Sequence, residues 1–252
     1  MTKVLRVSLP VLIFLVAWEA ASRMGVVNSA LFPPPTRALS ALVEMGRSGE
    51  LWRDMKASYG RLLLGMVCGV VIGTPIGLMT GRIHAVADVL VPLIQIFRPL
   101  PPVAIVPLVI VWFGIGESAK VFSIAFAVFF PIWLNTHLGA QQISAKFLWS
   151  ASTLTHSRWR IFRSVIFPAS LPLITAGLRG AIAVAFVMVF VSELAGASEG
   201  IGYEIAATHL AYRIDKMIAA LAVLGASGAL ADALFAASIT RIFPWLRFSH
   251  SK

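Results

Sequence analysis

The sequence is poor in charged residues and contains almost no cysteine. Only 13% of its 252 residues are charged, and the single cysteine, Cys68, excludes an intrachain disulfide. A soluble globular domain has about 25% charged residues. The scarcity of charge, together with 58% hydrophobic residues and a mean hydropathy of +0.86, predicts an integral membrane protein.

Several chemical motifs are also missing. The sequence has no Gly-x-x-x-x-Gly-Lys-Ser/Thr loop, so we expect no nucleotide bound in the P-loop manner. It has no His-Glu-x-x-His, and its five histidines are too scattered to suggest a metal site. The net charge of +10 comes from basic residues that cluster at the ends of apolar segments. We therefore expect them to set membrane topology, and we expect no nucleic acid partner.

Long apolar segments occupy most of the chain. A helix needs about 20 apolar residues to cross the hydrocarbon core, and six segments qualify: residues 7–25, 59–80, 85–113, 119–138, 171–194 and 217–235. The first resembles a signal peptide, but its apolar run is longer than is typical for one, so we expect it to be retained. With no tandem repeat, the sequence predicts one membrane domain spanning residues 1–252.

Six spans place both termini on one side of the membrane. The positive-inside rule puts the termini and the loop at residues 140–170 in the cytoplasm, and residues 28–58 and 193–216 outside. The third span contains five prolines, which remove backbone donors and interrupt a regular helix. Carbonyl groups freed inside a membrane must face protein or water, so we expect this span to be broken and buried.

The loop between the fourth and fifth spans contains the string "STLTHSRWRIFRSVIFPASLP". Its pattern predicts a short, partly amphipathic helix, a polar bend and a basic second helix that leads to Pro168. A loop that only links two spans does not require large apolar side chains, whereas this loop contains Leu154, Trp159, Ile161 and Phe162. We therefore interpret the loop as a binding surface for a partner.

At this loop the chain resembles the permease subunits of bacterial ABC importers, in the nitrate, sulfonate and taurine branch. The family signature is Glu-Ala-Ala-x3-Gly-x9-Ile-x-Leu-Pro, and residues 165–168 match its end. Thr155 then falls on the glycine, and of the first three residues only the alanine at 151 is kept. The strings "LWRDMKASYGRLLLG", "RPLPPVAIVPLVIVWFGIGESAK", "GLRGA" and "SELAGASEGIGYEI" extend the resemblance over nearly the whole chain.

The resemblance implies an all-α membrane protein with six transmembrane helices and the type I, MetI-like, ABC importer permease fold. It implies a location in the bacterial inner membrane, a second permease copy, two cytoplasmic ABC ATPase subunits, and a periplasmic or lipid-anchored substrate-binding protein. ATP and Mg²⁺ would bind to the ATPase, so we expect no cofactor and no catalytic residue in this chain. The residues expected to couple to the ATPase are Trp149, Ser150, Ala151, Leu154, Thr155, His156, Trp159, Phe162 and Pro168.

The substrate implied is a small anionic solute such as nitrate, a sulfonate or taurine. Arg98, in the middle of the third span, has two interpretations. Its guanidinium either bonds the carbonyls freed by the neighbouring prolines, or offers a fixed positive charge to the solute. The residues expected along the pathway are Arg98, Pro101, Pro102, Asn135, Arg179 and Glu193.

Three other classes remain as alternatives. A self-contained secondary transporter usually carries intramembrane carboxylates for coupling, whereas most of those here lie near span ends. A rhomboid-like intramembrane serine protease would use Ser227 of "GASG", but no later span supplies a histidine as base. An accessory or scaffold membrane protein is the third.

Overall fold

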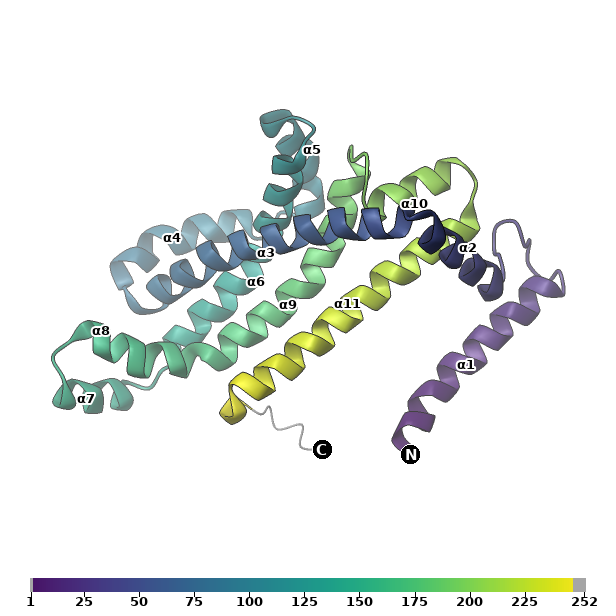
Figure 1. Cartoon of the computed structure of the whole chain (residues 1–252). Helices are drawn as coiled ribbons and strands as arrows, with labels where there is room; N and C mark the ends of the chain where they lie inside the picture. Colours follow the sequence, from purple (N-terminus) through teal and green to yellow (C-terminus); the bar gives the residue numbers. More distant parts are fainter. Residues whose placement is uncertain (1, 247–252) are drawn as a thin grey trace. The chain divides into compact units, whose positions relative to one another are not determined.

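The computed structural model describes residues 2–246, with side chains described for residues 9–245. Within that range the chain is helical and has no strand, as expected (Figure 1). The elements are α1 (Thr2–Arg23), α2 (Pro35–Ser48), α3 (Glu50–Arg82), α4 (His84–Phe97), α5 (Pro102–Phe113), α6 (Glu117–Gln141), α7 (Ala145–Leu154), α8 (Arg158–Ile161), a π-helical turn (Phe162–Ile166), α9 (Phe167–Leu194), α10 (Ile201–Leu210), α11 (Ile214–Ile242) and a 3₁₀ turn (Pro244–Leu246).

Four continuous helices are long and apolar enough to cross a membrane. They are α3, α6, the continuous helix Arg158–Leu194 that includes α8 and α9, and α11. The pair α4 and α5 qualifies together as a fifth, bent span. Over the described residues α1 is not among the helices that meet this criterion, so the sixth span stays a prediction.

The predicted break in the third span is confirmed. The axes of α4 and α5 differ by 96° across residues 98–101, where Pro101 precedes the first turn of α5 and Pro102 begins it. Proline is tolerated at a helix start because the amide that it lacks has no partner there. Pro92 and Pro107, in contrast, lie inside α4 and α5.

The single chain covers little of this span, so its expected burial stays a prediction. No residue of α4 is buried, and α5 buries only Val106 and Val109. An apolar membrane segment can face lipid or another subunit as well as its own chain. Its composition therefore predicts residence in the membrane without predicting which neighbour covers it.

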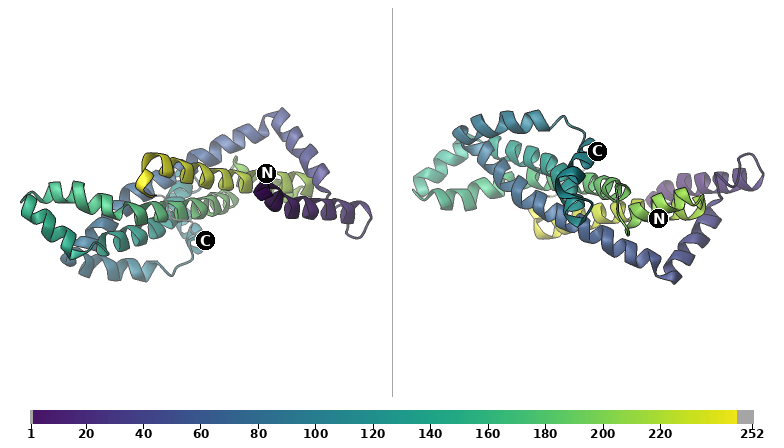
Figure 2. Two further views of the ribbon diagram at one scale, coloured as in Figure 1. Left: turned by 90° about the horizontal axis from the view of Figure 1, so that it is seen from below. Right: turned by 90° about the horizontal axis from the view of Figure 1, so that it is seen from above.

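The chain divides into two compact units, which are described separately here. The first comprises residues 1–58 and 197–226, and the second residues 59–196 and 227–252. In the second unit α6 and α9 lie side by side along their length (Figures 1 and 2). Ile124, Val128, Ile132 and Trp133 of α6 are almost completely buried in this unit.

Helix α3 packs closely on α6 through a row of glycines. Gly65, Gly69, Gly73, Gly77 and Gly81 recur every four residues, and a Cβ atom at any of them would lie 3.1 Å or less from an atom of α6. Small residues at this spacing let two membrane helices approach closely. The row therefore sets how closely α3 packs against α6 in the second unit.

In the first unit α2 forms a short amphipathic helix. It begins at Pro35 after the triple proline and buries Ala38, Ala41 and Met45. Its exposed Glu44 accepts ion-pair contacts from Arg213 at 3.5 Å and from Lys216 at 3.2 Å. These contacts connect α2 to the start of α11 within the unit.

Candidate functional site

The loop between α6 and α9 folds into a helical hairpin, defined here as residues 144–166. The Ser144 side chain accepts a hydrogen bond from the Lys146 amide and starts α7, and the Ser157 side chain accepts one from the Arg160 amide and starts α8. Thr155 leaves the helical conformation between the two helices. The predicted order of short helix, polar bend and basic second helix is confirmed.

One side of the hairpin is attached to the second unit. Phe162 packs against a cluster of Leu78, Ala140 and Ile174, and Ala151 is buried. The π-helical turn at Phe162–Ile166 then joins α8 to α9, with Pro168 in the first turn of α9. A π-turn marks a place where one extra residue changes the direction of the side chains that follow.

The other side of the hairpin exposes large apolar side chains. Leu154 is 86% exposed and Trp149 is 70% exposed, and Phe147 and Trp159 are similarly open. These four side chains, Phe147, Trp149, Leu154 and Trp159, are called the apolar patch, and Arg158, Arg160 and Arg163 of the same segment are also exposed.

The remaining loop residues have smaller roles in the structure. The Ser150 carbonyl accepts a hydrogen bond from the Thr153 hydroxyl, and the Thr155 hydroxyl accepts one from the Ser157 amide. His156 is exposed at the bend. The hairpin therefore brings all of the sequence-predicted coupling residues except Pro168 into one short segment.

The residues predicted to line a pathway have different surroundings. Arg98 ends α4 and is exposed, and no acceptor for its guanidinium lies among the described residues. Pro101 and Pro102 follow it at the bend. The Asn135 side chain donates a hydrogen bond to the Pro131 carbonyl at 2.9 Å within α6.

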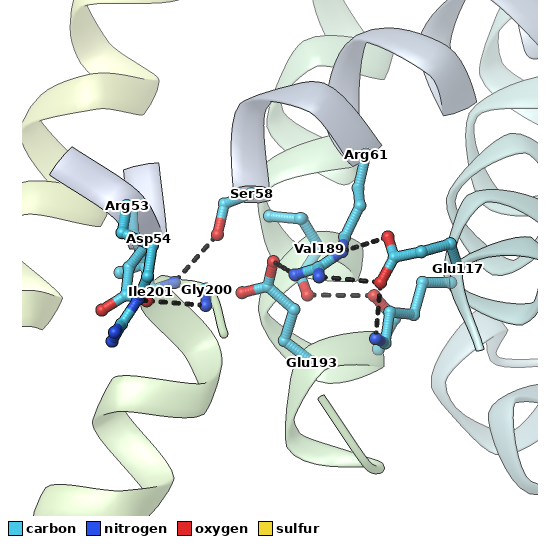
Figure 3. Close-up of polar contacts among 11 residues, drawn as sticks. Arg53, Asp54, Ser58, Arg61, Glu117, Val189, Glu193, Gly200 and Ile201 are labelled. Atoms are coloured by element: carbon cyan, nitrogen blue, oxygen red, sulfur yellow. Dashed lines mark hydrogen bonds and ion pairs between the residues drawn. The ribbon is translucent and has the colours of Figure 1, made fainter. Parts of the chain in front are cut away.

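Glu193, another predicted pathway residue, belongs to a buried ion network (Figure 3). Its carboxylate accepts a hydrogen bond from Arg61 Nη1 at 2.7 Å, and both side chains are almost completely buried. Arg61 Nε and Nη2 donate to the two Glu117 oxygens at 2.6 and 2.8 Å, and Lys120 Nζ donates to Glu117 Oε1 at 2.9 Å. The network joins α3, α6 and α9.

The sequence predicts a functional role for Glu193 but does not indicate Arg61 as its partner. The position of Arg61 just before an apolar run does signal a partner, because an arginine in a membrane helix is usually paired with an acidic residue. What the sequence lacked was any indication of which acid would lie opposite it.

A second polar site lies within the first unit, at the start of α10. Asp54 accepts a hydrogen bond from the Gly200 amide at 3.0 Å, and Ser58 accepts one from the Ile201 amide at 2.8 Å (Figure 3). These two residues, one turn apart on α3, serve as the helix cap that α10 lacks in its own sequence. Burial, together with the nearby carboxylates of Asp54 and Glu50, raises the pKa of Glu204 above its usual value.

Two alternative chemistries find no support in the geometry. In the part of the chain that the structure describes, no group of three His, Cys, Asp or Glu side chains is placed to hold a metal ion. The Ser227 hydroxyl, the nucleophile of the protease alternative, hydrogen-bonds with the Tyr59 phenol. His250 lies outside the described residues.

Comparison with known proteins identifies the family. A family model described as the inner membrane component of binding-protein-dependent transport systems matches residues 69–244. The chain belongs to this permease family.

Its relatives agree with the predicted branch. The chain is 30% identical over 238 residues to the taurine transport system permease protein TauC of Escherichia coli K12, covering 92% of this chain and 86% of that protein. It is 34% identical over 232 residues to the putative aliphatic sulfonates transport permease protein SsuC of the same organism, with coverage of 92% and 87%.

Solved structures support the fold. One chain of the MetNI methionine ABC transporter, in an inward-facing conformation, matches with a TM-score of 0.62 at 20% identity, covering 79% of this chain and 98% of that one. A chain from an amino acid ABC transporter matches with a TM-score of 0.59 at 18% identity, covering 80% and 96%. The MetI-like fold predicted from sequence is therefore confirmed.

The chain is thus a permease subunit of an ABC importer and a multi-pass protein of the inner membrane. It is not an enzyme, because ATP hydrolysis in this family takes place in a separate ATPase subunit. Its family implies two kinds of partner, an ATPase and a substrate-binding protein.

Proposed function

We propose that two copies of this permease form the pathway of an importer for small sulfonates or related anions, and that the hairpin at residues 144–166 binds the ATPase. ATP and Mg²⁺ bind to the two ATPase subunits, and a periplasmic or lipid-anchored binding protein delivers the solute. The substrate class rests on the taurine and sulfonate relatives. Both termini and the hairpin lie in the cytoplasm.

The exposed apolar side of the hairpin is the observation that carries the proposal. Phe147, Trp149, Leu154 and Trp159 are large, and each exposes more than two thirds of its surface in the single chain. A contiguous apolar patch with a polar border is typical of a protein interface. A short helix that places such side chains in a groove on a partner is a common mode of recognition.

The attachment of the hairpin explains how it could transmit motion. Phe162 lies between the exposed Trp159, with ring centroids 5.5 Å apart, and the buried cluster around Ile174 of α9. A displacement of the hairpin by the ATPase is therefore applied to the packed side chains at the base of α9. Packed interfaces pass on such displacements because their interiors compress little.

The test is co-purification of the ATPase with hairpin variants, together with solute uptake. Leu154→Asp and Trp159→Asp each place a charge in the proposed interface. A central apolar contact is worth about 2 kcal/mol, so each variant should weaken ATPase binding by roughly thirtyfold and abolish uptake. Ser152→Asp is the matched control, because Ser152 is exposed on the same helix without belonging to the apolar patch.

Membrane abundance is measured first, to separate loss of binding from loss of folding. If both hairpin variants are present at normal levels, retain the ATPase and still import the solute, the hairpin is not the coupling surface.

A further inference from the structure

An ion pair joins two membrane spans of the second unit. Arg179 of α9 donates from Nε to Asp232 Oδ1 at 2.6 Å and from Nη2 to Asp232 Oδ2 at 2.7 Å, with the parallel geometry that a guanidinium and a carboxylate prefer. Arg179 is one of the residues that the sequence predicts along the pathway, but the sequence does not indicate an acid as its partner. Asp232 is the partner that the structure adds.

Both residues lie deep inside their helices. Arg179 is 12 residues from the start of α9 and 15 from its end, and Asp232 is 18 and 10 residues from the ends of α11. At a rise of about 1.5 Å per residue, each lies roughly 15 Å or more from either helix end. Both helices belong to spans that are long and apolar enough to cross the membrane.

The pair is nevertheless open in the single chain. The Arg179 side chain is 49% exposed and the Asp232 side chain is 39% exposed, whereas in the pair between Arg61 and Glu193 the side chains are 3% and 0% exposed. Charged side chains at this depth face a protein interior or a water-filled cavity, and not lipid. The exposed side of Arg179 and Asp232 therefore points to water or to the second copy.

The residues around the pair leave both charged groups accessible. On α9 the exposed neighbours are Gly180 and Ala183, and a Cβ atom placed at Gly180 would have no atom within 4 Å. On α11 Asp232 has Ala233 next to it, also exposed. These three neighbours are small, and the side chains of the pair are 49% and 39% exposed, so a solute that reached the pair could contact the guanidinium and the carboxylate together.

We propose that Arg179 and Asp232 form a solute contact in the translocation path, selective for zwitterions with an oxyanion at one end and an ammonium at the other. This proposal rests on the proposed function of the chain as the pathway of an importer. The guanidinium fork binds the three-oxygen face of a sulfonate, and the carboxylate binds the ammonium. Taurine has these two groups.

The pairing of the two residues suits passage of a solute. Between transport events each residue neutralises the other, so no unpaired charge remains in the membrane interior. A passing zwitterion exchanges one ion pair for two, and the original pair re-forms when it leaves. A path must bind its solute strongly enough to admit it and weakly enough to release it, and a net-neutral site meets both needs.

The first experiment asks whether the pair faces water. Ala183→Cys lies one turn from Arg179 on the same exposed face, and it is introduced in a Cys68→Ser background into the permease purified with its ATPase in nanodiscs. A water-soluble thiol reagent should label this position. The control, Val71→Cys on the apolar outer surface of α3, should stay unlabelled. Absence of labelling at position 183 with the complex intact would overturn the proposal.

The second experiment asks which solutes bind, without the binding protein and its own selectivity. Taurine and ethanesulfonate, which lacks the amine, are compared as protectants against labelling at position 183. Taurine should protect at a concentration on the order of tenfold lower, since only taurine adds a charged hydrogen bond to Asp232. Asp232→Asn should abolish this preference. Equal protection by the two solutes in the unaltered pair would overturn the zwitterion selectivity.

A charge exchange separates a solute contact from a structural bridge. The double variant Arg179→Asp with Asp232→Arg keeps the ion pair between the helices but reverses the direction in which it presents its charges. Uptake of taurine should fall while the complex still assembles. Uptake equal to that of the unaltered protein would show that the pair is only a bridge. The hairpin variants test ATPase binding in a separate measurement. A failed test of the solute contact is therefore distinguishable from a failed test of the proposed function.

Discussion

Arg61 binds carboxylates from two other helices with a single guanidinium. Its Nη1 bonds to Glu193 of α9, and its Nε and Nη2 bond to Glu117 at the start of α6. The fork of donors on arginine makes this possible, whereas a lysine has a single ammonium group. Arg61 thereby holds together three helices of the second unit.

We expect Arg61→Gln to lower stability strongly. The substitution leaves Glu193 buried without a counter-charge, and breaking a buried pair from one side costs about 3–5 kcal/mol. The measurement is the midpoint of thermal unfolding in nanodiscs, compared with Arg53→Gln. Arg53 lies on the same helix but is 56% exposed, and its contact with Asp54 is longer, at 3.5 Å. Equal midpoints for the two variants would contradict the role given to Arg61.

At the scale of elements, the glycine row on α3 is the feature that sets one helix against another. At Gly81 a Cβ atom would lie 2.6 Å from the His137 carbonyl oxygen, and at Gly69 it would lie 2.3 Å from Val128 Cγ2. A side-chain atom can rotate away, but the carbonyl at His137 belongs to a regular helix and can move only with α6. Gly81 is therefore the less tolerant of the two positions.

We expect Gly81→Ala to destabilise the second unit by about 1–3 kcal/mol, the usual cost of forcing an extra methyl group into a packed interface. Gly60→Ala is the matched control on the same helix, because a Cβ atom there meets nothing within 4 Å. It should be neutral, or slightly stabilising, because alanine favours the helix over glycine. The measurement is denaturant or thermal unfolding of both variants. A loss of stability for Gly60→Ala as large as that for Gly81→Ala would rule out close packing as the cause.

At the scale of the whole molecule, the family implies an ATPase and a substrate-binding protein as partners, and the proposed function requires them to bind on opposite sides of the bilayer. The hairpin at residues 144–166 and the segment at residues 193–216 are predicted to lie on opposite sides. The loop charges and the family both favour the hairpin inside. This orientation is the prediction on which the placement of the ATPase depends.

We expect an impermeant thiol reagent added to whole cells to label Ser198→Cys and not Ser157→Cys, each in a Cys68→Ser background. Both positions are exposed. The nearby Gly200 is unsuitable for labelling, because it has a φ of 127° and its amide bonds to Asp54, so a side chain there would strain the start of α10. Opening the membrane should make position 157 reactive. The reverse pattern in intact cells would invert the topology.

The class of protein, its family and the hairpin can all be predicted from the sequence alone. These follow from local properties: the length of apolar runs, the prolines at residues 99–102 that break a helix, and the serines that start α7 and α8. These features depend only on residues close together in the sequence, so they can be recognised without knowing the tertiary contacts.

Which charged and polar side chains pair with one another is seen only in the tertiary structure. Arg61 and Glu193 are 132 residues apart, Arg179 and Asp232 are 53 apart, and the Ser58 side chain caps a helix that starts 143 residues later. A charge in an apolar run signals that a partner is needed but carries no information on its identity, because the partner is chosen by the packing of the helices. The same packing distinguishes Arg61, which the chain encloses, from Arg179, whose side chain it leaves half exposed.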